Sequence, residues 1–273
     1  MFVCVFSMEK RQNATPGARG DMPPTDEWTH VFDLDGTLYP IENGYESACR
    51  RRVFAYMASG ACPGITDEVE AKKIWSEAFP VYNQTLRSLR ARGYDGFDEE
   101  EYWAYTRGDP RTHLREDRET RAMVEALRGR KVVFTNCHEK QAREALDALG
   151  LSDCFDGVFG AGGMGEVCKP ETEAFRRLFA AHGIDDPTKC VFYEDSLKNL
   201  RAASSLGMVT VLVAGETLEE ELRAGNADVD FVDVIVHGGR LNAASVAAAS
   251  PFASRARAPL RVLLGKDDAD AEE

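Results

Sequence analysis

Residues 30–40 read His-Val-Phe-Asp-Leu-Asp-Gly-Thr-Leu-Tyr-Pro, and the apolar start of this stretch predicts a buried strand. In an extended backbone, residues two positions apart point the same way, so Asp33 and Asp35 share one side of that strand. Gly36 permits a sharp turn directly after them, because glycine adopts positive φ at no steric cost. The stretch therefore predicts two carboxylates at the carboxyl end of a strand, where open α/β sheets bind their ligands.

This pair of carboxylates indicates a bound cation. Two close carboxylates repel each other unless a cation or a shared proton relieves them. A hard divalent cation such as Mg²⁺, which takes oxygen ligands, is the simplest relief. Taken alone, the Asp-x-Asp tripeptide is also typical of a strand that ends in an Asx-type turn. We favour the metal interpretation because three further groups of residues later in the chain fit the chemistry of a metal site.

The composition excludes several classes of protein. The 273 residues are 44% hydrophobic and 29% charged, which is typical of a globular protein. The formal net charge of −13 opposes binding to nucleic acid polymers and to anionic lipid, although a local metal and lysine can still attract a small phosphorylated metabolite. No apolar run approaches the ~20 residues that span a bilayer. We therefore expect no nucleic-acid or membrane partner, and the sequence indicates no particular oligomeric state.

The pattern of cysteines indicates the cellular compartment of the protein. There are seven, they are scattered, and none forms a Cys-x-x-Cys pair, which argues against a zinc ribbon or a dithiol redox site. Such cysteines are typical of reduced thiols, so we expect a cytoplasmic protein. The N-terminal leader leaves organelle targeting open, because Glu9 is its only acidic residue before Asp21. Met8 and Met22 are alternative starts of the chain.

The pattern along the chain divides it into four parts: a disordered leader over 1–27, a core over 28–40 and 116–237, a helical insert over 41–115, and a poorly ordered tail over 238–273. The insert shows helical spacing of its apolar residues and no strand pattern. The second part of the core alternates strands with helices, which predicts an α/β fold with a parallel sheet and helices on both faces. We also expect a flexible loop over 160–165 and a short packed piece over 260–264.

Three further groups of polar side chains follow predicted strands or loops of the core. They are Thr135 and Asn136 after a strand over 131–134, Lys169 before a helix over 171–182, and Glu194 and Asp195 after a strand over 190–193. The carboxyl ends of parallel strands share one edge of a sheet, so these side chains can converge on the first acid pair. Each also has a structural explanation by itself. Thr135 and Asn136 could cap the helix that follows them, Ser196 or Asp195 could cap the next one, and Lys169 could be a solvated surface residue.

The combined set resembles the haloacid dehalogenase-like hydrolase superfamily, in its phosphatase branch. Four motifs carry the likeness, and they are Asp33-Leu-Asp-Gly-Thr, Thr135 at the end of Val132-Val-Phe-Thr-Asn, Lys169 in Val167-Cys-Lys-Pro-Glu, and Glu194-Asp195-Ser. The resemblance implies a Rossmann-like catalytic core. It also implies that the helical insert is a cap placed just after the first strand.

The resemblance further implies catalytic roles for the first acid pair. Asp33 would be the nucleophile that forms an aspartyl-phosphate, which divides one difficult displacement into two easier ones. Asp35 would be the general acid that protonates the leaving oxygen, and then the base that activates water.

Metal and phosphate binding are implied for the remaining motif residues. Mg²⁺ would be held by Asp33, the backbone carbonyl of Asp35 and Asp195, with Glu194 supporting these ligands from behind. The phosphate oxygens would be bound by Thr135, the Asn136 amide and Lys169. Lys169 would also stabilise the negative charge that is added in the reaction.

Within the superfamily, several stretches are most similar to the pyrimidine 5'-nucleotidase-like group. They are residues 35–40, Thr135-Asn-Cys-His-Glu-Lys, Phe155-Asp-Gly-Val, Val167-Cys-Lys-Pro-Glu and Tyr193-Glu-Asp-Ser-Leu-Lys-Asn-Leu. The group often has two aspartates where this chain has Glu194 and Asp195. The likeness implies hydrolysis of a nucleoside 5'-monophosphate such as UMP or CMP. An aromatic residue of the insert could stack on the base, and the candidates are Tyr45, Tyr56, Trp75, Tyr82, Tyr94, Tyr102, Trp103 and Tyr105.

Other functions remain as alternatives. A sugar-phosphate or phosphoglycolate phosphatase of the same superfamily is the main one, and a phosphomutase would keep all four motifs. A dehalogenase normally lacks the second acid, so Asp35 argues against it. A non-catalytic binding module on the same fold usually loses at least one catalytic acid, whereas this chain keeps them all.

Overall fold

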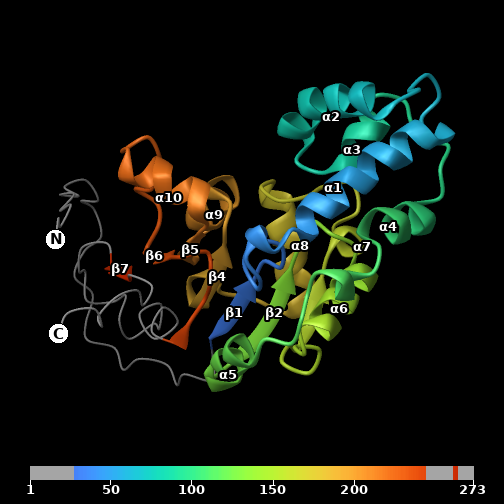
Figure 1. Cartoon of the computed structure of the whole chain (residues 1–273). Coiled ribbons are helices and arrows are strands. Elements are labelled where there is room, and N and C mark those ends of the chain that lie inside the picture. The colour runs from blue at the N-terminus through green and yellow to red at the C-terminus, as the bar shows by residue number, and fades with distance from the viewer. Residues whose placement is uncertain (1–27, 244–260, 264–273) are drawn as a thin grey trace, which may run out of the picture.

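The computed structural model of the protein describes residues 28–243 and 261–263 (Figure 1). Its centre is a seven-stranded sheet in the order β3-β2-β1-β4-β5-β6-β7, in which every neighbouring pair is parallel. The strands are β1 (Thr29–Phe32), β2 (Arg130–Phe134), β3 (Gly157–Phe159), β4 (Cys190–Glu194), β5 (Val209–Ala214), β6 (Val234–His237) and β7 (Arg261–Leu263). The predicted α/β class, with a Rossmann-like parallel sheet, is therefore confirmed.

Helices cover both faces of this sheet, because successive side chains of each strand point to opposite faces. On one face, α5 (Arg118–Ala126) and α6 (Glu139–Ala148) pack over the stacked rings of Phe32 and Tyr193, whose centroids lie 4.3 Å apart. On the other face, α8 (Thr172–His182) and α9 (Leu197–Ser205) pack over Val31 and Phe192. The central strands are thus buried on both sides, and α10 (Glu216–Arg223) follows β5.

The helical insert lies between β1 and β2 in the chain, and Figure 1 shows these two strands pointing toward it. It contains α1 (Tyr45–Tyr56), a π-helical turn (Met57–Ala61), α2 (Glu68–Tyr82), α3 (Thr85–Ala91) and α4 (Glu99–Arg107). The side chains of Asp67 and Asp98 begin α2 and α4 by accepting hydrogen bonds from backbone N–H groups of the first turn. Buried residues such as Met57 and Leu89 give the insert an apolar core of its own.

The glycine-rich segment over 160–165 is not a flexible loop, so that prediction is wrong. Residues Ala161–Met164 form the short helix α7. The carboxylate of Glu139, at the start of α6, accepts hydrogen bonds from the backbone N–H groups of Gly160, Gly162 and Gly163 at 2.9, 3.1 and 2.8 Å. These bonds also hold the pKa of Glu139 below its ordinary value, although its partial burial opposes this. The segment is ordered because one carboxylate satisfies backbone donors that would otherwise face water.

The expected leader over 1–27 lies outside the described residues, as do residues 244–260 and 264–273 of the expected tail. Within the tail, β7 pairs with β6 at the edge of the sheet, where the short packed piece over 260–264 was expected. No helix in the described part of the chain has both the length and the apolar character needed to cross a membrane.

A buried histidine in β1 makes the stability of this fold depend on pH. His30 is 3% exposed, and its ring nitrogens lie 3.0 Å from the Tyr193 hydroxyl and 3.2 Å from the Arg128 carbonyl oxygen. Burial lowers the pKa of His30 to about 4 from 6.5. The unfolded chain therefore binds more protons between these values, and His30 contributes stability that is complete above pH 6.5 and lost toward pH 4.

We expect the free energy of unfolding to fall by up to about 3 kcal/mol across this window because of His30 alone. Urea unfolding of the wild type and of His30→Gln, measured at several pH values, separates this contribution from that of the carboxylates. The glutamine variant keeps an amide for hydrogen bonding and does not titrate. A wild-type pH profile parallel to that of the variant would contradict the prediction.

Candidate active site

A cavity of about 640 Å³ lies between the carboxyl ends of the strands and the helical insert. All of the site residues predicted from the sequence line it, and they are Asp33, Asp35, Thr135, Asn136, Lys169, Glu194 and Asp195. Asp33 stands directly at the end of β1, where its backbone N–H donates to the Tyr193 carbonyl oxygen at 2.9 Å. The parallel sheet thus brings motifs that are up to 162 residues apart to one edge, as their positions at strand ends predict.

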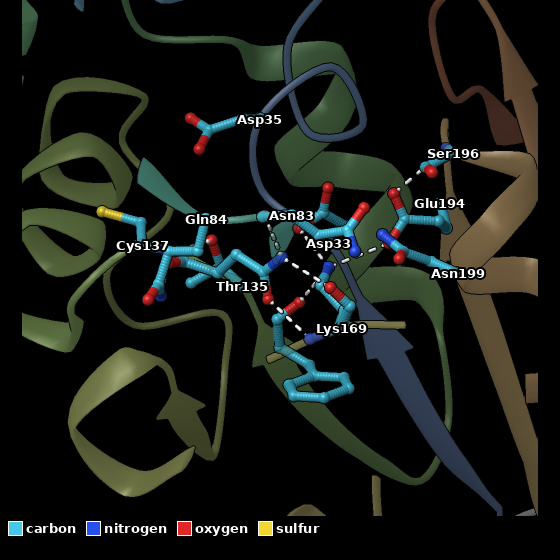
Figure 2. A network of polar contacts seen from close by, with 12 residues as sticks. Asp33, Asp35, Asn83, Gln84, Thr135, Cys137, Lys169, Glu194, Ser196 and Asn199 are labelled. Carbon is cyan, nitrogen blue, oxygen red and sulfur yellow. Dashed lines mark hydrogen bonds and ion pairs between the residues drawn. The ribbon is translucent and has the colours of Figure 1, made fainter. Parts of the chain in front are cut away.

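Lys169 is the centre of the buried part of the site (Figure 2). Its Nζ atom donates to Asp33 Oδ1 at 2.7 Å, to Glu194 Oε2 at 2.8 Å and to the Phe134 carbonyl oxygen at 2.8 Å. Burial opposes the charge of this ammonium group, but the two carboxylates raise the pKa of Lys169 above its ordinary value. Lys169 is therefore a fully buried cation with all three donors used, and not a solvated surface lysine.

Three carboxyl groups form the acidic part of the site. Oxygen atoms of Asp33, Glu194 and Asp195 all lie within 4.8 Å of one another. Burial and the charge of Glu194 raise the pKa values of both Asp33 and Asp195 well above their ordinary range. One lysine cannot balance two buried carboxyl groups and a half-buried one, so this donor set fits a divalent cation with oxygen ligands.

Gly36 allows the Asp195 carboxylate to lie against the turn that follows Asp33 and Asp35. Its φ is +80°, and a Cβ atom placed on it would lie 2.3 Å from Asp195 Oδ2. A larger residue would therefore be strained in its backbone and would also collide with the carboxylate. The sequence predicted the turn at Gly36 but not this contact with the fourth motif.

Glu194 lies behind the other two acids and holds its neighbours in place. It is 0% exposed. Its Oε2 accepts from Lys169 Nζ and from Asn199 Nδ2 at 2.9 Å, and its Oε1 accepts from the backbone N–H of Ser196 at 3.1 Å. Burial raises the pKa of Glu194, yet Lys169 reverses the effect and leaves it lowered. Asn199, on α9, belongs to the stretch after Tyr193 that carries the family likeness, but no role was predicted for it.

The Asn136 side chain positions Lys169 and touches the insert. Its Oδ1 accepts from the Lys169 backbone N–H at 2.9 Å, and its Nδ2 donates to the carbonyl oxygens of Lys169 and Asn83 at 3.0 and 3.3 Å. From the insert, Gln84 Nε2 donates to the Asn136 carbonyl oxygen at 2.9 Å. Thr135 is buried beside it, and its Oγ1 accepts from the Cys137 N–H at 3.0 Å. The Asn136 side chain is therefore already engaged within the protein.

Asp35 stands apart from the other acids, and Figure 2 shows its carboxylate pointing away from Asp33 and Lys169. Arg107, the last residue of α4, donates from Nη2 to Oδ1 at 2.7 Å and from Nη1 to Oδ2 at 3.0 Å. The Tyr39 hydroxyl also donates to Oδ1. Burial raises the pKa of Asp35, but the guanidinium outweighs it and the pKa is lowered. Sequence reasoning missed Arg107, which lies 72 residues from its partner and is one of 33 Lys and Arg residues.

The insert lines its side of the cavity with aromatic side chains. Of the candidates from the sequence, Trp75, Tyr102 and Trp103 line the cavity, and Phe79 lines it as well. The rings of Trp75 and Phe79 stack with centroids 4.6 Å apart, and the Arg50 guanidinium lies 5.2 Å from the Trp75 ring. Aromatic rings at the edge of a cavity suit a planar ligand group.

A family model and a curated relative match this chain in sequence. A model of the haloacid dehalogenase-like hydrolase family matches residues 29–207, which contain all four motifs. Phosphate metabolism protein 8 of Saccharomyces cerevisiae is 22% identical to this chain over 201 residues, covering 66% of this chain. The matched part spans only 60% of the length of that relative.

Solved structures also resemble this chain, at low sequence identity. A HAD phosphatase from Thermococcus onnurineus superposes with a TM-score of 0.53 and 22% identity, over 78% of this chain and 94% of that chain. A β-phosphoglucomutase from Clostridium difficile has a TM-score of 0.48 and 18% identity, over 77% of this chain and 90% of that chain. The first of these likenesses supports the fold described above.

Proposed function

This chain belongs to the haloacid dehalogenase-like hydrolase family, and we propose that it is a Mg²⁺-dependent phosphomonoester hydrolase that acts through an aspartyl-phosphate on Asp33. Membership confirms the resemblance seen in the sequence at the level of the superfamily. The observation that carries the proposal is the buried contact of 2.7 Å between Asp33 and Lys169 at the end of β1, beside a second acid pair. A carboxylate nucleophile with a fixed cation beside it suits attack on an anionic phosphate.

Residues at the same edge would hold the metal. They are the side chains of Asp33 and Asp195 and the backbone carbonyl of Asp35. When bound, Mg²⁺ would neutralise charge on the phosphate and on the carboxylate, so that one anion can attack another. Glu194 would keep Lys169 and the turn at Ser196 in place without binding the ion itself.

The residues of the chain supply the remaining chemistry. Asp35 first takes a proton from solvent, because Arg107 favours the ionised form of this carboxyl in the free protein. In the first step, the Asp33 carboxylate bonds to phosphorus, the bond from phosphorus to the leaving oxygen breaks, and that oxygen takes the proton from Asp35. In the second step, the Asp35 carboxylate takes a proton from water, the water oxygen bonds to phosphorus, and the Asp33–phosphorus bond breaks. Thr135, the Asn136 N–H and Lys169 would bind the phosphate oxygens in both steps.

A pyrimidine nucleoside 5'-monophosphate is the proposed substrate. The sequence likeness to the pyrimidine 5'-nucleotidase-like group supports this choice. So do the aromatic residues of the insert that line the cavity, because stacking of a base on an aromatic ring contributes ~1–3 kcal/mol.

Phosphate release from a panel of phosphomonoesters tests both the proposed phosphatase activity and the proposed nucleotide substrate. The panel contains UMP, CMP, AMP, GMP, pyridoxal phosphate, phosphoglycolate and a hexose phosphate, each assayed with Mg²⁺ and with a chelator. We expect kcat/KM for UMP or CMP to exceed that for the purines by at least ~10-fold, which is about 1.4 kcal/mol. If phosphoglycolate or a hexose phosphate leads, the nucleotide assignment is wrong and the phosphatase stands. Activity unaffected by the chelator would refute the dependence on metal.

The two acids of the fourth motif should differ in their effect on metal binding. We expect Asp195→Ala to raise the Mg²⁺ concentration for half-maximal activity by at least ~10-fold, because it removes an oxygen ligand. Glu194→Ala should raise it less, since Glu194 faces Lys169 and Asn199. Activity measured over a Mg²⁺ titration compares the two variants. A larger shift for Glu194→Ala would mean that the two roles are reversed.

A further inference from the structure

The acid–base carboxyl of Asp35 is held by the helical insert and not by the core alone. We propose that Arg107 is a positioning residue for Asp35, whose guanidinium orients the carboxyl group so that only Oδ2 keeps an open position for proton transfer. The inference rests on the proposed phosphatase function, in which Asp35 gives and takes the proton. It adds a residue from a different part of the chain to that step.

The hydrogen bonds of Asp35 identify the available oxygen. A carboxylate has about four acceptor positions, two on each oxygen. Oδ1 accepts from Arg107 Nη2 at 2.7 Å and from the Tyr39 hydroxyl, so both of its positions are used. Oδ2 accepts from Arg107 Nη1 at 3.0 Å, which leaves it one position. Because Asp35 also lines the cavity, we assign proton transfer to this open position of Oδ2.

The guanidinium is directed to Asp35. Both terminal nitrogens of Arg107 bond to this one carboxylate, and the Nε atom is buried without a hydrogen-bond partner among the described residues. A paired fork of this kind fixes the plane of a carboxylate as well as its position. Arg107 therefore orients Asp35 rather than linking it into a wider network of acids.

The neighbours of Arg107 hold the fork in place. Its guanidinium carbon lies 4.8 Å from the centroid of the Tyr45 ring. Its backbone carbonyl oxygen accepts from the Tyr45 hydroxyl at 3.1 Å and from Arg52 Nη1 at 3.3 Å. The next residue, Gly108, has φ +56°, and a Cβ atom on it would lie 2.7 Å from the Arg52 guanidinium. The end of α4 is thus closely packed around a preorganised Arg107.

A purely structural role predicts a different outcome. Buried ion pairs contribute little net stability compared with apolar packing, so stability alone is weak grounds for this pair. If Arg107 only joined the insert to the core, its loss would slow all substrates alike. If it orients Asp35, its loss matters only when proton donation limits the rate.

The leaving group separates these two cases. The measurement is kcat/KM for the best nucleotide or other alkyl phosphate of the panel and for p-nitrophenyl phosphate, whose leaving group needs little protonation. We expect Arg107→Ala to lower kcat/KM at least ~30-fold for the alkyl phosphate and less than ~5-fold for p-nitrophenyl phosphate. Arg107→Lys keeps the charge but not the planar fork, and it should lose an intermediate amount for the alkyl phosphate only.

A double-mutant cycle tests whether Arg107 acts through Asp35. In an Asp35→Asn background, where the carboxyl group is absent, we expect Arg107→Ala to change kcat/KM by less than ~3-fold. The matched control is Arg92→Ala, which removes another arginine of the insert. Because Arg92 pairs with the exposed Glu77, we expect this variant to behave like the wild type. Thermal unfolding shows whether each variant is folded. If Arg107→Ala does not fold, Arg107→Lys replaces it in the same comparison of substrates.

Each outcome either supports or overturns the positioning role of Arg107. Equal losses for both substrates, or an equal loss in the presence and absence of the Asp35 carboxyl, would overturn the positioning role. A wild type that releases phosphate from no substrate would instead refute the proposed function, and the two failures are therefore distinguishable. A loss confined to the alkyl phosphate and to the Asp35-containing background supports the proposal.

Discussion

Asp33→Asn is expected to lower turnover of the best phosphomonoester at least ~10³-fold, which is about 4 kcal/mol of barrier. The amide keeps the shape of the carboxylate but removes the charge that attacks phosphorus. Glu194 cannot take over this role, because its oxygens are bonded to Lys169, Asn199 and Ser196. The assay is phosphate release under saturating Mg²⁺, on protein in which mass spectrometry verifies the Asp33→Asn substitution.

The structure adds an expectation about stability that separates loss of function from loss of fold. Burial and the charge of Glu194 raise the pKa of Asp33, so the ionised form is disfavoured in the folded protein. The amide removes that cost and still offers Lys169 an oxygen acceptor. We therefore expect thermal unfolding of Asp33→Asn at pH 7 to begin no lower than that of the wild type. Near-normal turnover of this variant would overturn the mechanism.

Asp35→Asn is expected to slow the hydrolysis of an alkyl phosphate by ~10²–10⁴-fold, the usual range for loss of general acid–base catalysis. The carboxamide cannot donate the proton that the leaving oxygen requires. The defect should shrink for the first step with p-nitrophenyl phosphate, whose leaving group is already a weak base. Single-turnover release of nitrophenol measures that step directly.

Two readouts keep this second prediction falsifiable. An equal loss in the first step for good and poor leaving groups would count against a general-acid role for Asp35. The carboxamide of the variant can accept from only one of the two Arg107 nitrogens, so thermal unfolding must show that the insert still packs on the core. Asp195→Ala gives a comparison, since its defect should respond to added Mg²⁺ and that of Asp35→Asn should not.

Local patterns in the sequence determined the framework of the protein. The spacing of Asp33 and Asp35, with glycine directly after them, predicted a strand that ends in two acids, because strand geometry and the φ freedom of glycine are local properties. The alternation of strands and helices predicted the parallel sheet, and the sheet explains why Thr135, Lys169 and Asp195 line one cavity. The family follows from the same four motifs.

Only the tertiary structure decided which side chains are already engaged. The bond of Asp35 to Arg107, the use of the Asn136 side chain on Lys169, and the bonds of Glu139 to glycine N–H groups join residues 72, 33 and up to 24 positions apart. No local rule predicts such pairs, because they depend on how helices pack and on which buried donors need acceptors. The sequence therefore determined where the acids stand, whereas packing of the insert decided which way the Asp35 carboxylate faces.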